Sequence, residues 1–173
     1  MSGPAARIPP FEPGEHPVGS GTVHSLIADP VVAVVGFDGS DPSARALVTA
    51  ARWLQDRSGW LEVVYVAHVP AAVPIYPAAL GELTESFGDI ERQLERQVAD
   101  QLRSFQALWH FRRRDGVVGH ELLAVADELR RQNGQHATIV LVVGGSERKY
   151  HRLVGSVASH LERVDRFPVV VVP

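Results

Sequence analysis

A near-continuous apolar run, VVAVVGF over residues 31–37, constrains the fold of this chain more than any other feature. A strand with apolar residues at every position has no polar face for solvent, so the run is typical of a strand buried on both faces of a sheet. Strands of this kind lie at the centre of parallel sheets, where helices cover both faces. The run therefore predicts an α/β fold if helices alternate with further strands.

The rest of the chain does alternate in this way. Further strands are predicted at residues 61–69, 109–113, 138–143 and 169–172. Apolar residues at helical spacing predict helices between the strands, at residues 42–56, 83–105, 122–129 and 157–164. Five strands separated by helices predict a doubly wound parallel sheet with right-handed crossovers, in a three-layer α/β/α arrangement.

Single residues suggest where these elements begin and end. Asp41 followed by Pro42 is typical of an N-cap and a first-turn proline, so we expect the first helix to be capped by Asp41. Gly59 is expected to close that helix. Residues 70–81 carry three prolines and are expected to form a loop.

The chain is predicted to hold one domain, residues 30–173, preceded by an arm. Residues 1–29 contain five prolines and four glycines with few periodic apolar positions. Such a segment buries too little surface to offset the entropy of ordering, so we expect a disordered N-terminal arm. The remaining residues show no internal repeat.

Composition excludes several classes of function. The chain has no cysteine, which removes disulfide scaffolds, zinc ribbons and cysteine nucleophiles. Its net charge of −3 gives no broad basic field for nucleic acid. No apolar run has the length of a membrane span, and no signal peptide is recognisable, so a cytoplasmic location is expected. Eight histidines show no metal-ligand spacing, and no metal is predicted. Walker, G-x-S-x-G and G-x-G-x-x-G motifs are absent.

Two predicted strand ends carry chemistry that could bind a ligand. In doubly wound sheets, ligands bind beyond the carboxyl ends of the strands. Asp38 lies between two glycines at the end of the first strand. The fourth strand ends in Gly144 and Gly145, and a Gly155-Ser156 pair then opens a helix. Glycine backbone, a helix N-terminus and a hydroxyl together favour a phosphate, and three cations lie between the pairs: Arg148, Lys149 and Arg152.

A purely structural interpretation of both strand ends remains open. The paired glycines can form a turn, the Gly155-Ser156 pair can cap a helix, and the basic residues can be a solvated surface. Asp38 can equally form a local Asx-turn.

Three segments together resemble the universal stress protein family. They are VVAVVGFDGSDPSARAL from Val31, VVGGSERKYHRLVGSVASHL from Val142, and the closing PVVVVP from Pro168. Their order and spacing also fit, so the resemblance covers residues 30–173. It implies a sheet of strand order 3-2-1-4-5, in which the ends of strands 1 and 4 lie side by side.

The resemblance also implies a nucleotide site. Many members bind ATP through G-x-x-G, nine residues, then G-[ST]. Gly145, the nine residues after it and Gly155-Ser156 match the second half of that pattern. Val142 occupies the place of the first glycine, so Gly144 serves only if the loop has lost two residues. Asp38 matches the acidic residue near the adenine and ribose, and Val66 matches a second-strand position whose backbone meets the adenine.

The sequence thus favours a non-catalytic stress or regulatory protein that binds an adenine nucleotide, ATP, between strands 1 and 4. The alternative is a nucleotide-free dimeric interaction protein of the same family. An ATP hydrolase or nucleotidyl transferase is a third possibility, but near the site only Asp38 and Asp41 could hold a metal.

A homodimer is expected through the last strand, formed by Val169, Val170, Val171 and Val172. In the implied strand order this strand lies at a sheet edge, where unpaired backbone groups can pair with a second copy. The opposing interpretation is that Pro168 and Pro173, which lack N–H donors, bracket the strand to prevent pairing.

Overall fold

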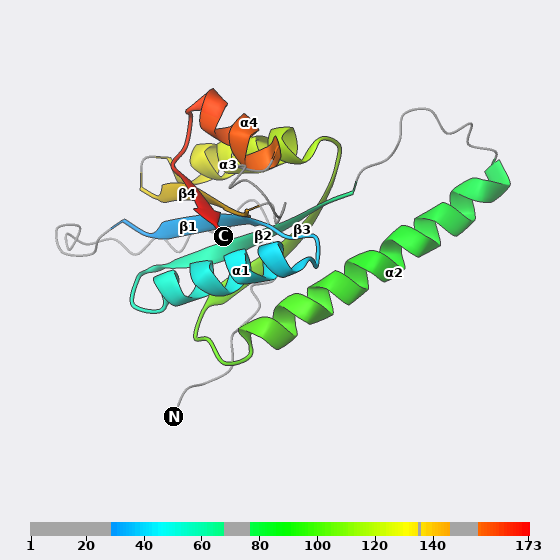
Figure 1. Cartoon of the computed structure of the whole chain (residues 1–173), viewed down its shortest axis with the longest axis horizontal. Helices are drawn as coiled ribbons and strands as arrows, with labels where there is room; N and C mark the ends of the chain where they lie inside the picture. Colours follow the sequence, from blue (N-terminus) through cyan, green and yellow to red (C-terminus); the bar gives the residue numbers. More distant parts are fainter. Residues whose placement is uncertain (1–28, 68–76, 135, 146–155) are drawn as a thin grey trace.

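Five parallel strands form one sheet in the order β3-β2-β1-β4-β5, as predicted (Figure 1). The computed structural model describes residues 29–67, 77–134, 136–145 and 156–173. Its strands are β1 (Val31–Gly36), β2 (Gly59–Ala67), β3 (Leu108–Asp115), β4 (Thr138–Gly144) and β5 (Val169–Val172). Residues 1–28, and with them nearly all of the expected arm, lie outside the described residues.

Two helices cover each face of the sheet, which gives the predicted three layers (Figure 1). The helices are α1 (Asp41–Leu54), α2 (Pro77–Leu102), α3 (Val118–Asn133) and α4 (Ser156–Val164). Residues of α1 and α2 share one buried apolar cluster with the sheet, and residues of α3 and α4 share the other. In the part of the chain that the structure describes, no helix is long and apolar enough to cross a bilayer.

The burial of β1 confirms the prediction from its apolar run. Val32, Ala33, Val34 and Val35 are all 0% exposed. Ala33 and Val35 face α1 and α2, whereas Val32 and Val34 face α3 and α4. Alternate side chains of β1 point to opposite faces of the sheet, and each face is covered by helices. No polar residue therefore interrupts the run.

Three predicted boundaries are wrong, and each has a local cause. Ser40, not Asp41, is the N-cap of α1, since its hydroxyl accepts the Ser43 N–H at 3.4 Å. Asp41 instead lies in the first turn, where the helix dipole favours a carboxylate. Gly59 does not close α1 but begins β2 at φ +152°, where a Cβ would lie 1.9 Å from the Val31 carbonyl oxygen.

The third wrong boundary is the start of α2. The loop expected over residues 70–81 is contradicted from Pro77 onward, where the helix begins. Proline fits the first turn of a helix because the N–H that it lacks would have no partner there. Residues 70–76 lie outside the described residues.

A buried carboxylate ties α3 to the β2–β3 side of the sheet. Glu62 on β2 is 2% exposed and lies 2.7 Å from Arg112 Nε and 3.0 Å from His110 Nδ1. Arg112 also binds Glu128 of α3 at 2.8 Å, and Arg114 contacts the same carboxylate. Buried charges persist where they are paired, so this network fixes the position of α3 over the sheet.

Candidate functional site

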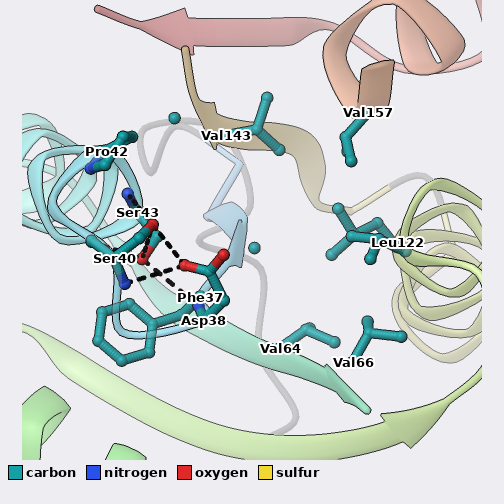
Figure 2. Close-up of a pocket in the computed structure, with 13 residues that line it drawn as sticks. Phe37, Asp38, Ser40, Pro42, Ser43, Val64, Val66, Leu122, Val143 and Val157 are labelled. Atoms are coloured by element: carbon teal, nitrogen blue, oxygen red, sulfur yellow. Dashed lines mark hydrogen bonds between the residues drawn. The ribbon is translucent and has the colours of Figure 1, made fainter. Parts of the chain in front are cut away.

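A hollow of about 150 Å³ lies at the carboxyl ends of β1, β2 and β4. This is the edge at which ligands bind in doubly wound sheets. Figure 2 shows side chains from α1, β2, β4, α3 and α4 around it. The lining residues are Gly36, Phe37, Asp38, Ser40, Pro42, Ser43, Val64, Val66, Val118, Leu122, Val143, Gly144 and Val157.

Asp38 carries the charge of this hollow and is held by the turn that leads into α1. Its Oδ1 accepts the backbone N–H of Ser40 at 3.0 Å and the Ser40 hydroxyl at 2.5 Å (Figure 2). The Ser43 hydroxyl donates to the Ser40 carbonyl at 2.9 Å, which fixes the turn from the helix side. Gly39 makes the turn possible, because its φ of +81° is unfavourable for any other residue.

These contacts decide the charge of Asp38. Partial burial by itself raises the pKa of the carboxyl, but hydrogen bonds from Ser40 and Ser43 outweigh it and hold the pKa of Asp38 below 3.8. Asp38 is therefore an anion at neutral pH, with donors on its protein side.

The opposite side of the hollow is apolar. Val64 and Val66 project from β2, and Leu122 of α3 faces them across the space (Figure 2). Val66, which the family resemblance singled out, is therefore part of the lining. An apolar slot with one polar group at its edge suits a flat ring that carries hydrogen-bond donors on one side.

Gly144 borders the hollow and packs closely against the backbone of α1. A Cβ on Gly144 would lie 2.4 Å from the backbone carbon of Pro42, so only glycine lets the end of β4 approach the first turn of α1. Gly36 is less constrained, because its Cβ would meet the Leu122 side chain at 3.2 Å.

The other predicted phosphate ligands are placed differently. Gly145 lies outside the lining, and its N–H donates to the Val172 carbonyl at 2.6 Å, so the geometry does not support it as a phosphate donor. Ser156 is the exposed first residue of α4, directly before Val157 in the lining, as expected for a Gly-Ser pair that opens a helix. Gly155 lies outside the described residues, as do Arg148, Lys149 and Arg152.

The universal stress protein family model matches residues 32–173. The chain belongs to that family. The matched region begins at the second residue of β1 and runs through β5. No match was found among curated proteins.

Solved structures of universal stress proteins share the fold at low identity. One, in complex with cAMP, is 23% identical with a TM-score of 0.56, and the match covers 84% of this chain and 98% of that chain. UspA from Lactobacillus plantarum is 21% identical with a TM-score of 0.56, covering 84% and 99%. A family protein from Burkholderia pseudomallei is 21% identical with a TM-score of 0.52, covering 82% and 95%.

Sequence reasoning missed several residues of this universal stress protein's apolar lining. Leu122 was expected only as a core-facing position of a helix and Val157 only as part of the next helix, and Val118 was not singled out. Ser43 was not singled out either, although its hydroxyl braces the Asp38 turn. A signal did exist for Ser43: a serine three residues after an N-cap serine can hydrogen-bond back to it. The described residues contain no group of three or more candidate metal ligands.

Proposed function

We propose that this protein binds an adenine nucleotide in the hollow between β1 and β4 and acts as a non-catalytic stress or regulatory protein. The observation that carries the proposal is the pairing of a charged Asp38 with an apolar slot formed by Val64, Val66 and Leu122. An adenosine needs both features, since its base is flat and largely apolar and its ribose offers hydroxyl donors.

The geometry favours one orientation. The base lies against the partly exposed Val66, and Asp38 accepts the ribose hydroxyls. The phosphates extend toward Ser156, where α4 begins and its dipole places partial positive charge. The hollow holds about 150 Å³, below the ~300 Å³ of typical complete ligand sites, so it suits the base while the phosphates extend beyond it.

The complex of a structurally similar universal stress protein with cAMP supports an adenine nucleotide as the ligand class. ATP is our specific proposal, with Gly144 shaping the site and Gly155 and Ser156 nearest the phosphates. Gly145 is assigned to strand pairing instead.

The absence of catalysis is part of the proposal. Among the described lining residues, Asp38 is the only titratable side chain. Phosphoryl transfer requires charge-stabilising groups and an oriented nucleophile, and one carboxylate does not supply them. We propose the cytoplasm as the location, and neither nucleic acid nor membrane as a partner.

Two measurements test nucleotide binding. Mass spectrometry of ligand released from the purified, denatured protein should detect an adenine nucleotide. Calorimetric titration should show binding of ATP or cAMP and not of CTP, with Ser156→Ala weakening ATP binding roughly 10- to 100-fold through the loss of a charge-assisted hydrogen bond. Absence of binding at millimolar concentrations (on the order of the weakest specific affinities) would contradict the proposal. Unchanged affinity in Ser156→Ala would remove only that residue.

A homodimer through β5 is a second proposal, and it is the core of the alternative function as a nucleotide-free interaction protein. β5 is an edge strand, and Val170 on it is 39% exposed. Antiparallel pairing with a second copy would bury Val170 and give hydrogen-bond partners to the backbone N–H and C=O groups at the free edge of β5. Sedimentation should show a dimer that Val170→Lys and Val172→Lys weaken, and a monomeric unmodified protein would contradict this.

A further inference from the structure

A second, larger hollow lies on the outer face of α1. It has a volume of about 500 Å³ and is bordered by Gln101 of α2 on one side and Val172 of β5 on the other. Figure 1 shows α1 below the strands, with α2 on the same side of the sheet and extending away from it. Six α1 residues form the floor: Asp41, Ala44, Arg45, Val48, Thr49 and Arg52. We call this hollow the α1 groove.

The floor of the α1 groove presents two guanidinium groups at a fixed spacing. Arg45 and Arg52 are seven residues apart, which places them on one helix face about 10 Å apart along the axis. Ala44 and Val48 have short side chains, so the floor between the two arginines is not filled by larger groups. Arg45 Nε donates to the Pro173 carbonyl at 2.7 Å, which holds this side chain at the β5 border. A guanidinium has five N–H donors, so it can serve a further acceptor.

Two groups in the α1 groove have no partner among the described residues. The Arg52 side chain is exposed and forms no hydrogen bond or ion pair with any of them. Gln101 Oε1 is enclosed by protein, yet no described donor reaches it. An occupant that satisfies both must carry anionic groups and also an N–H donor, which points to an acidic peptide segment.

The chain itself contains a segment with matching charges. Glu12 and Glu15 are the two acidic residues of the first 28, in the sequence PPFEPGEHP over residues 9–17. Prolines at positions 9, 10, 13 and 17 favour polyproline II, which has three residues per turn and a rise of about 3.1 Å. Residues 12 and 15 then share one face about 9 Å apart, close to the spacing of the two arginines.

We propose that residues 9–17 dock as an extended segment in the α1 groove of the same chain, with Glu15 on Arg52 and Glu12 on Arg45. The path of the chain fits this direction. Val31 pairs with Gly59, so the chain enters β1 at the edge of the sheet where α1 ends, which is the Arg52 end of the groove. The 14 residues from Glu15 to Asp29 span at most about 46 Å, far more than the groove requires.

A paramagnetic label on the full-length protein tests this docking directly. The chain has no cysteine, so Gly14→Cys provides a single attachment point for a nitroxide, on a face of the segment that Glu12 and Glu15 do not share. We expect the backbone amide signals of residues 44–52 to be lost and then restored when the nitroxide is reduced. Unaffected α1 signals would overturn the proposal.

Charge reversal distinguishes specific pairing from chance proximity. Arg52→Glu should restore the amide signals of α1, and adding Glu15→Arg to that variant should remove them again. Arg131→Glu is the matched control: Arg131 is an exposed arginine on α3, on the other face of the sheet, and its reversal should change nothing. Persistence of the signal loss in Arg52→Glu would contradict the assigned pairing.

A mixed sample separates the same chain from a second copy. Nitroxide-labelled protein without ¹⁵N is combined with unlabelled ¹⁵N protein, so signal loss arises only between chains. We expect no loss in the mixture. Loss there would overturn docking within one chain and assign the groove to the arm of a second copy.

Discussion

The carboxyl ends of β1 and β4 look alike in sequence and differ in structure. Each combines glycines with a serine that begins a helix. At the end of β1, the turn holds the Asp38 carboxylate through Ser40 and leaves it beside an apolar hollow. At the end of β4, the Pro42 backbone fills the space beside Gly144, and the Val172 carbonyl already accepts the N–H of Gly145. A glycine after a strand therefore indicates a close approach, and only the surroundings show whether a ligand or the protein itself makes it.

The strongest test of this difference is Gly144→Ala. The new Cβ would lie 2.4 Å from the Pro42 backbone, which cannot move without displacing α1. We expect the free energy of unfolding to fall by about 3 kcal/mol, the upper range for overpacking. Chemical denaturation measures this.

Gly88→Ala is the control for that substitution. Gly88 lies within α2, and its Cβ would meet only the end of the Arg92 side chain at 3.5 Å. Alanine is the better helix former, so this variant should gain about 0.5 to 1 kcal/mol. If both variants lost stability, or if neither did, the close packing of Gly144 against Pro42 would not explain the effect.

The next largest effect concerns the β1 end. Asp38→Asn removes the charge that we propose accepts the ribose hydroxyls, so nucleotide affinity should fall roughly 10- to 100-fold. Calorimetric titration measures the change. Asp41→Asn is the matched control, because Asp41 lies three residues away in α1 and outside the lining of the nucleotide hollow. Equal losses in the two variants would mean that net charge, rather than the position of Asp38, determines binding.

The pH dependence of stability gives a smaller signal from the same carboxylate. The pKa of Asp38 in the folded protein lies below its ordinary value of 3.8, so the folded state is favoured while the carboxyl is ionised. This contribution is fully present above pH 3.8 and is lost as the pH falls through the folded pKa. The stability difference between the wild type and Asp38→Asn should therefore be constant from neutral pH down to about 5 and shrink below 3.8. If the stability difference between the two proteins grew on acidification, the pKa of Asp38 would be raised in the folded protein and not lowered.

Gly145→Ala should have the smallest effect. Alanine retains the N–H that binds Val172, and its Cβ would meet the Val172 oxygen at 3.2 Å, which a shift of a few tenths of an ångström relieves. Stability should change by less than about 0.5 kcal/mol, and ATP affinity should not change. A clear loss of affinity in calorimetry would return Gly145 to the phosphate site.

The sequence predicted the helices and strands because buried faces produce a periodic pattern of apolar residues. β1 is apolar at every position because both faces are covered, and the faces of the helices repeat at their own period. The order of the strands left no such trace and came from the family resemblance. The N-cap of α1 was misassigned because Ser40 and Asp41 are both good caps, and the Asp38 turn decides between them.

The candidate site could be predicted only where a strand ends. Asp38 follows the buried strand β1, so the topology alone brings it to this edge, whereas Val66, near the end of β2, came from the family resemblance. Leu122 and Val118 lie on the sheet-facing side of α3, where periodicity predicts core packing and cannot reveal that these residues also border a hollow. The roles of Gly144 and Gly145 depend on contacts with α1 and β5, which no local pattern records.

The position of β1 also has a consequence for synthesis on the ribosome. β1 is the first strand made, yet it pairs with β2 on one side and with β4 on the other, whose residue 138 is the partner of residue 31. At ~5 to 20 residues per second, translation from β1 to β4 takes on the order of 5 to 20 s. Throughout that interval β1, whose residues 32–35 become fully buried in the folded protein, has an open edge in the nascent chain and is exposed to aggregation until β4 emerges.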